Sequence, residues 1–169
     1  MNTSNLSYSV WAIFKNEDKL FLNKLQRNLN KKFNGPKFPL HLTISSGFKI
    51  DQKDIFYKMK LIQKESERFF IETNNFAYKN SFFQSIFLKI KINNKLTQQK
   101  KIIDKYLRPK KKIYFPHISL FYGILSIYKK KKIIKDFKKY KKRLFIKEIN
   151  LVENDEKNFK WKIIKRYKI

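Results

Sequence analysis

The two histidines of this chain, His41 and His117, stand in the same local pattern. Each is followed two residues later by a small hydroxyl residue, Thr43 or Ser119, and apolar residues lie between and around them. On a β-strand, residues i and i+2 point to the same face, about 6.5–7 Å apart. We therefore expect each histidine to lie beside a neutral hydrogen-bond donor, with the intervening residues turned into the core.

Two such pairs, placed opposite each other across a cleft, suit in-line displacement at phosphorus. One imidazole takes a proton from the attacking water while the other gives a proton to the departing oxygen. Histidine titrates near neutrality, so one ring can be neutral while the other is charged. The hydroxyls of Thr43 and Ser119 can donate to the non-bridging phosphate oxygens, where charge grows in the transition state. Two histidines and few carboxylates are a poor ligand set, so we expect no metal and no other cofactor.

A single histidine on a strand is more often a structural residue than a catalyst, so the pairing has to carry the functional interpretation. The chain holds 10 Ser and 4 Thr among 169 residues, so a random residue is followed at i+2 by one of them about 8% of the time. Both histidines show this spacing by chance roughly 0.7% of the time. The paired pattern therefore favours catalysis.

The composition indicates one folded domain. A chain of 169 residues can bury a substantial core, and 42% hydrophobic residues are too many for a disordered chain. Cysteine is absent, which excludes disulfides and thiolate chemistry. No uncharged apolar run approaches the ~20 residues of a membrane helix. We expect a soluble, cytoplasmic monomer with no membrane partner.

The formal charge of +28 invites a nucleic-acid interpretation. The basic residues are 36 Lys but only 5 Arg, whereas phosphate and base readers favour the bidentate fork of arginine. Lysine is also scattered together with Asn and Ile along the sequence. We interpret the charge mainly as compositional bias and solubility. It should still raise the local concentration of an anionic substrate.

Strand-like and helix-like segments alternate along the chain. We expect strands at 7–14, 40–48, 69–78, 82–92, 113–122, 144–152 and 159–168, and helices at 17–33, 51–68, 96–107 and 128–142. Asn16 is expected to cap the first helix. One motif strand in each half of the chain favours an α+β fold with two similar lobes that face each other.

Two H-x-[ST] strands in a chain of this size resemble the 2H phosphoesterase superfamily, and in particular its plant-type cyclic phosphodiesterase branch. The segments "YSVWAIF", "KFNGPKFPLHLTI", "FFQSIFLKI" and "YFPHISLFYG" are similar to that branch in order and spacing, and a late strand with Trp161 fits as well. The resemblance implies a single domain over residues 1–169 with two pseudo-symmetric lobes. Two antiparallel β-sheets would line a central cleft, with helices on the outside.

The resemblance also implies hydrolysis of a ribose cyclic phosphate to a phosphomonoester. The substrate would be a small nucleotide, either a nucleoside 2',3'-cyclic phosphate or ADP-ribose 1'',2''-cyclic phosphate. His41 and His117 would be the acid/base pair, and Thr43 and Ser119 would bind the phosphate. The orientation of the bound ring decides which histidine is the base and which the acid.

Three aromatic residues match ligand-contacting positions of that branch: Tyr122, Phe83 and Trp11. Tyr122 lies five residues after His117, so a regular strand turns it to the opposite face. It reaches the cleft only if the strand ends or bulges there. Phe83 and Trp11 are equally well explained as core residues. A functional role for them would be to stack on a base or to seal the pocket.

Two other functions remain open. The enzyme could act on RNA, at a 2',3'-cyclic end, a 2'-5' linkage or a cyclic oligonucleotide, and the high positive charge favours this modestly. Alternatively, the chain could be a non-catalytic basic RNA-binding module in which the motifs are remnants. The presence of both complete H-x-[ST] pairs argues against the second alternative.

Overall fold

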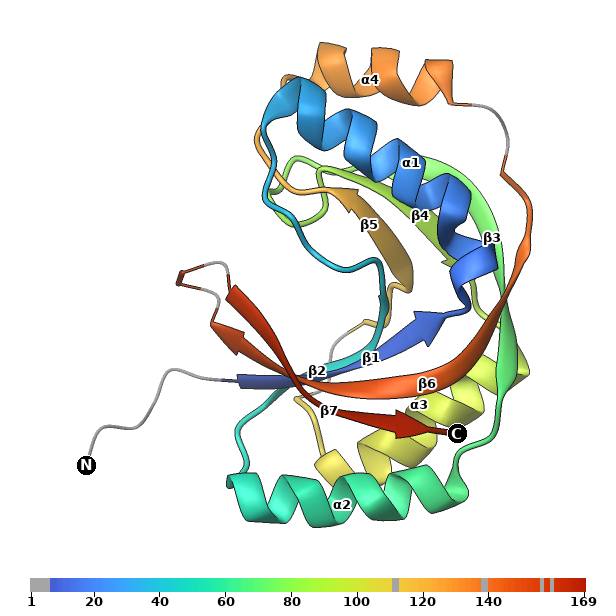
Figure 1. Ribbon diagram of the computed structural model, residues 1–169, viewed down its shortest axis with the longest axis vertical. Coiled ribbons are helices and arrows are strands. Elements are labelled where there is room, and N and C mark those ends of the chain that lie inside the picture. Colours follow the sequence, from blue (N-terminus) through green and yellow to red (C-terminus); the bar gives the residue numbers. More distant parts are fainter. Residues whose placement is uncertain (1–6, 111–112, 138–139, 156, 159) are drawn as a thin grey trace.

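The chain has the expected α+β fold in a computed structural model, which describes residues 7–110, 113–137, 140–155, 157–158 and 160–169 (Figure 1). The elements follow in the order β1 (Ser7–Phe14), α1 (Asn16–Phe33), β2 (Leu42–Phe48), α2 (Gln52–Glu65), β3 (Phe69–Tyr78), β4 (Ile86–Lys91), α3 (Asn94–Leu107), β5 (His117–Phe121), α4 (Ile127–Asp136), β6 (Arg143–Asp155) and β7 (Lys160–Lys168). None of the described helices is both long and apolar enough to cross a membrane.

The described strands form one curled antiparallel sheet in the order β2-β1-β6-β3-β4-β5. The long strand β6 pairs with β1 along one edge. Along its other edge it pairs first with β3 and then with β7. The two antiparallel sheets expected from the sequence are therefore the two halves of one sheet, and β6 belongs to both. The curl brings the outermost strands β2 and β5 into contact. Strand β2 begins directly after His41, and β5 begins with His117.

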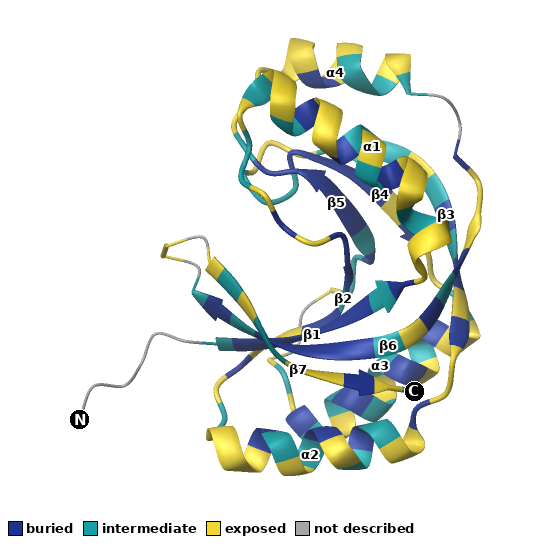
Figure 2. Cartoon of the chain, in the orientation of Figure 1, coloured by how far each residue is buried: buried dark blue, intermediate teal, exposed yellow. Residues whose placement is uncertain are grey.

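The helices cover the outside of the curl in two pairs (Figure 1). Helix α1 packs against β5 and β6 and α4 against β3, while α2 packs on α3 and β7, and α3 on β2 and β3. In Figure 2 the helix faces turned toward the sheet are buried and the outward faces are exposed. The concave side of the sheet is left for the site.

Alternating burial fixes the register of the two motif strands. Leu42 and Ile44 on β2, and Ile118 and Leu120 on β5, are fully buried in the hydrophobic core. Burial of each such side chain is worth about 1.5–3 kcal/mol. A slip of one residue would expose these four side chains and turn the motif residues into the core. Core packing thus decides which face the residues between them occupy.

Some element ends differ from the sequence prediction. Asn16 does not cap α1: the helix already begins at this residue, and Lys15 precedes it without a side-chain cap. Asp18 in the first turn instead accepts the backbone N–H of Phe145 at 2.8 Å. The last expected helix ends early, at Asp136. Residues 138–139 of that helix and residue 159 of the last expected strand lie outside the described residues.

Candidate active site

Both histidine rings are held by the same kind of hydrogen bond. His41, one residue before β2, donates from Nδ1 to the carbonyl of Pro39 at 2.7 Å. His117, the first residue of β5, donates from Nδ1 to the carbonyl of Phe115 at 2.8 Å. A carbonyl oxygen can only accept, so Nδ1 carries the hydrogen in both rings. Each neutral imidazole therefore keeps an unprotonated Nε2 for proton transfer.

The local sequence explains this matched geometry. A proline lies just before each histidine, Pro39 two residues before His41 and Pro116 directly before His117. Proline fixes its own φ and restricts the preceding residue to extended conformations. Both approaches to the motif strands are therefore stiff. The carbonyl two residues upstream is held within reach of the ring in each case.

Trp11 fixes the plane of the His41 ring. The two rings stack with centroids 3.5 Å apart and an angle of 5° between planes. Trp11 lies on β1, where it is the register partner of Thr43 on β2. The indole covers one face of the imidazole and excludes water from it. The tryptophan is thus a core residue that also positions the candidate catalytic ring.

Burial lowers the pKa of both histidines. His41 is 7% exposed, and the resulting desolvation lowers its pKa from 6.5 to about 4. The hydrogen bond to Pro39 raises this pKa by a smaller amount, and the charge of His117 lowers it slightly further. Burial is also the main cause that lowers the pKa of His117, and the charge of Lys79 lowers it further. The hydrogen bond to Phe115 acts in the opposite direction and raises it. The strand that follows His41 and the strand that begins with His117 contact each other. An anion between the two rings would raise both pKa values.

The two hydroxyls differ in their present partners. The Thr43 hydroxyl makes no hydrogen bond to any described residue, and Thr43 lines a pocket of about 730 Å³ together with His117. Ser119 Oγ donates to the Phe83 carbonyl at 3.0 Å. A hydroxyl has one hydrogen to donate, so Ser119 must rotate before it can donate to a phosphate. Thr43 needs no such change.

Tyr122 turns to the same side as Ser119 because β5 ends at Phe121. Burial raises the pKa of Tyr122 to about 12, and the nearby Ser119 hydroxyl opposes this rise by a smaller amount. Its ring stacks on Phe38, with centroids 3.7 Å apart and an angle of 11°. Edge-on and tilted contacts complete what we call the aromatic cluster, which consists of Phe38, Phe83, Tyr122 and Trp161.

A family profile described as "Cyclic phosphodiesterase-like protein" matches residues 6–169. The chain belongs to this family. The match covers nearly the whole sequence and confirms the resemblance to the 2H phosphoesterase superfamily and its cyclic phosphodiesterase branch. The cyclic phosphodiesterase-like chain is thus placed among phosphoesterases.

Solved structures show the same fold at low sequence identity. E. coli LigT in its apo form has a TM-score of 0.66 at 11% identity, with 96% of each chain covered. LigT complexed with 3'-AMP has a TM-score of 0.66 at 12% identity, with 96% of this chain and 97% of that chain covered. TT0787 of Thermus thermophilus has a TM-score of 0.61 at 14% identity, with coverage of 96% and 97%. A search of the curated proteins found no match.

The seven site residues predicted from the sequence fall into two groups in this cyclic phosphodiesterase-like protein. Direct contacts or shared register join them in two groups, Trp11 with His41 and Thr43, and Ser119 with Phe83 and Tyr122. His117 belongs to the same strand as Ser119 and interacts electrostatically with His41.

Sequence reasoning missed three contributors to the site. Phe38 packs on Tyr122 and Trp161 completes the aromatic cluster. Lys79 lies 4.1 Å above the ring of Phe115, next to His117. A signal for Phe38 was present, because a Phe-Pro dipeptide precedes each histidine. Nothing local in the sequence connects Lys79 to His117.

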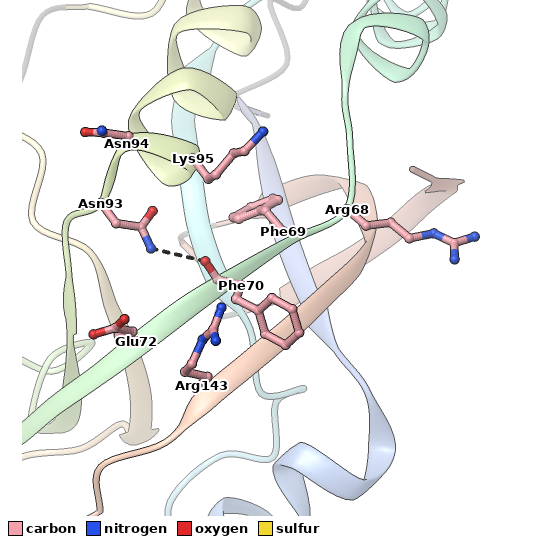
Figure 3. Close-up of a pocket in the computed structure, with 8 residues that line it drawn as sticks. All are labelled: Arg68, Phe69, Phe70, Glu72, Asn93, Asn94, Lys95 and Arg143. Atoms are coloured by element: carbon pink, nitrogen blue, oxygen red, sulfur yellow. Dashed lines mark hydrogen bonds between the residues drawn. The ribbon is translucent and has the colours of Figure 1, made fainter.

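A second depression, on the outside of the sheet, has no comparable chemistry (Figure 3). It measures about 580 Å³ and lies between β3, the start of α3 and Arg143 of β6. Its polar groups already have partners: Asn93 donates to the Phe70 carbonyl at 3.1 Å, and the Arg143 guanidinium lies 4.4 Å above the Phe70 ring. Within the described part of the chain, no group of three or more His, Asp or Glu side chains could hold a metal ion.

Proposed function

We propose that this protein hydrolyses a cyclic phosphate on a ribose to a phosphomonoester, without a metal ion. The substrate is a nucleoside 2',3'-cyclic phosphate or ADP-ribose 1'',2''-cyclic phosphate. One observation supports this most directly: both imidazoles are anchored through Nδ1 to a carbonyl two residues upstream. Each ring thereby keeps Nε2 for proton transfer and has a hydroxyl residue two positions further on.

The proposed reaction needs only water and the two rings. The water oxygen attacks phosphorus in line with the departing ribose oxygen, and one Nε2 takes the proton that the water loses. The bond from phosphorus to that ribose oxygen breaks. The other ring, as an imidazolium, gives its Nε2 proton to the ribose oxygen. The products are a phosphomonoester and a free ribose hydroxyl, and the orientation of the cyclic phosphate decides which histidine takes which role.

The surroundings support charge development at this position. Thr43 can donate directly to a non-bridging oxygen, and Ser119 can do so after it rotates away from the Phe83 carbonyl. In the free protein burial keeps His41 neutral at pH 7, so it is able to accept a proton. The bound phosphate anion raises the pKa of the histidine that faces it, so this second ring is protonated and can act as the acid.

The aromatic cluster is the proposed support for a base or for the closing of the pocket. Trp161 is half-buried, so part of its ring is accessible. Stacking of a base on an exposed aromatic face is worth about 1–3 kcal/mol. Solved structures of LigT contain 3'-AMP, ATP or NADP+, which supports a nucleotide as the ligand of this fold.

Hydrolysis of 2',3'-cyclic AMP and of ADP-ribose 1'',2''-cyclic phosphate in the presence of EDTA tests the proposal. We expect turnover by the wild type and none by the His41→Ala/His117→Ala double variant. A Lys60→Ala variant, at an exposed position of α2, is the control for preparation artefacts and should retain full turnover. Loss of turnover in EDTA, or no turnover of either substrate, would overturn the metal-free mechanism. RNA binding unaffected by the histidine changes would then identify the non-catalytic module.

A further inference from the structure

The pocket that Thr43 and His117 line is larger than a cyclic phosphate needs. It is about 730 Å³ in volume, with Thr43 and His117 in one wall. Cationic side chains from the middle of α3 and from the segment after its end form the other wall: Lys100, Arg108 and Lys110. This volume lies in the range of sites that hold a whole small ligand. A cyclic phosphate alone leaves the cationic wall unused.

The only carboxylate in this pocket is already neutralised within the described residues. Asp104 accepts from Lys100 Nζ at 2.7 Å through one oxygen and from Ser45 Oγ at 2.6 Å through the other. The bond from Ser45 also ties α3 to β2, the strand of Thr43. Three cations and one carboxylate leave this wall with a net charge of +2. It attracts an anion into the pocket that His117 also lines.

Arg108 and Lys110 hold unpaired positive charges. Neither side chain makes an ion pair or hydrogen bond with any described residue. Arg108 also adopts the left-handed conformation, with φ 46° and ψ 60°, at the C-terminus of α3. Glycine is the favoured residue there, because a side chain costs free energy in this conformation. In this chain the position is held by Arg108, one of five arginines, and the residue lines the pocket together with Pro109 and Lys110.

We propose that this cationic wall binds a second phosphate of the substrate, the one attached to the 5' oxygen of the ribose that carries the cyclic phosphate. The inference rests on the proposed function. Adjacent phosphates of a nucleotide are separated by a single ribose, and one pocket is lined by Thr43 and His117 as well as by the three cations. Arginine suits a phosphate group because its fork can donate two parallel hydrogen bonds.

This subsite separates the candidate substrates by their chemistry. A plain nucleoside 2',3'-cyclic phosphate has a free 5' hydroxyl and leaves the cations without a ligand. The cyclic end of an oligoribonucleotide has a 5' phosphodiester, and ADP-ribose 1'',2''-cyclic phosphate has a pyrophosphate on the corresponding oxygen. Both would occupy the wall.

The test compares kcat/KM for 2',3'-cyclic AMP with and without a 5'-phosphate. We expect a preference of tenfold or more for the 5'-phosphorylated substrate. The Arg108→Gly/Lys110→Ala variant should lose that preference, so that its kcat/KM values for the two substrates lie within about twofold of each other. Glycine is favoured at the left-handed position, so this variant should fold at least as well as the wild type. Arg27→Ala, an exposed position on α1, removes one charge elsewhere and should leave the preference intact.

A preference near one in the wild type, or an equal loss in Arg27→Ala, would overturn the subsite. If the preference is present, the relative kcat/KM values of a dinucleotide with a 2',3'-cyclic end and of ADP-ribose 1'',2''-cyclic phosphate distinguish the two sources of the second phosphate. If the protein turns over none of these substrates, the subsite is tested by calorimetry, which compares the affinities for adenosine 3',5'-bisphosphate and 3'-AMP. Without turnover, tighter binding of the bisphosphate that depends on Arg108 keeps the subsite and rejects the hydrolase. Equal binding rejects both.

Discussion

Replacement of His41 by glutamine should change how the stability of the protein depends on pH. Burial lowers the pKa of His41 in the folded protein from 6.5 to about 4. The unfolded chain therefore binds a proton at pH values where the folded protein does not. Between pH 6.5 and 4 protonation stabilises the unfolded state, so the free energy of unfolding falls as the pH falls. His41→Gln removes the titrating group, and with it this contribution.

The expected size of the effect follows from the two pKa values. One pH unit of pKa difference corresponds to about 1.4 kcal/mol. Acidification from pH 7.5 to pH 4 should therefore cost the wild type about 3 kcal/mol more than His41→Gln. The substitution also removes the stack on Trp11, which lowers stability at every pH. The difference in slope, and not the offset, carries the information.

Urea unfolding followed by tryptophan fluorescence measures this slope. The free energy of unfolding in water is obtained at several pH values from 7.5 to 4 by linear extrapolation. The other titrating groups are common to both proteins and largely cancel in the comparison. Parallel curves for the wild type and His41→Gln would show that His41 titrates normally. That outcome would refute the argument that it is a buried, neutral proton acceptor.

Three further predictions concern catalysis, pH dependence and packing. His41→Ala and His117→Ala should each lower kcat by a factor of about 10² to 10⁴ in single-turnover assays, and a loss below tenfold in either would contradict the two-histidine mechanism. Lys79→Gln removes a charge that lowers the pKa of His117, so the limb of the kcat/KM profile that His117 sets should move to higher pH, the acidic limb if His117 is the base and the alkaline limb if it is the acid; two unmoved limbs would show that this charge is screened. In Gly35→Ala the new Cβ would lie 2.5 Å from a ring carbon of the buried Phe121, and the free energy of unfolding should drop by about 1–3 kcal/mol; unchanged urea unfolding would show that the ring can shift.

Local sequence patterns were enough for the elements and for the motif strands. Alternation of apolar residues at Leu42, Ile44, Ile118 and Leu120 predicts strands with one buried face, and these side chains are fully buried. The first strand and the third were predicted with the bounds that the structure has, Ser7–Phe14 and Phe69–Tyr78. Periodicity carries this information because burial in a strand repeats every two residues.

Contacts between distant segments were outside the reach of the sequence. The face on which Tyr122 lies depends on where β5 ends, and the sequence allowed either face. The bond from Ser119 to the Phe83 carbonyl joins residues 36 positions apart. Asn16 illustrates a further limit: it is a good capping residue, but α1 already begins at Asn16, and Asp18 in the first turn accepts a hydrogen bond from the backbone of β6. In each case tertiary packing decided between local options of similar free energy.

The shared strand β6 has a consequence for the chain while it is being synthesised. Strand β1 pairs with β6 along residues Ser7 to Phe14, and β3 pairs with it at Phe69 to Glu72, so both wait for a segment that begins at Arg143. Until that segment leaves the ribosome, the nascent protein has two apolar strands with open hydrogen-bonding edges. Such edges recruit other chains and favour aggregation. We expect ribosome-bound chains that end before Arg143 to depend on chaperones, and release from that dependence to coincide with the emergence of β6.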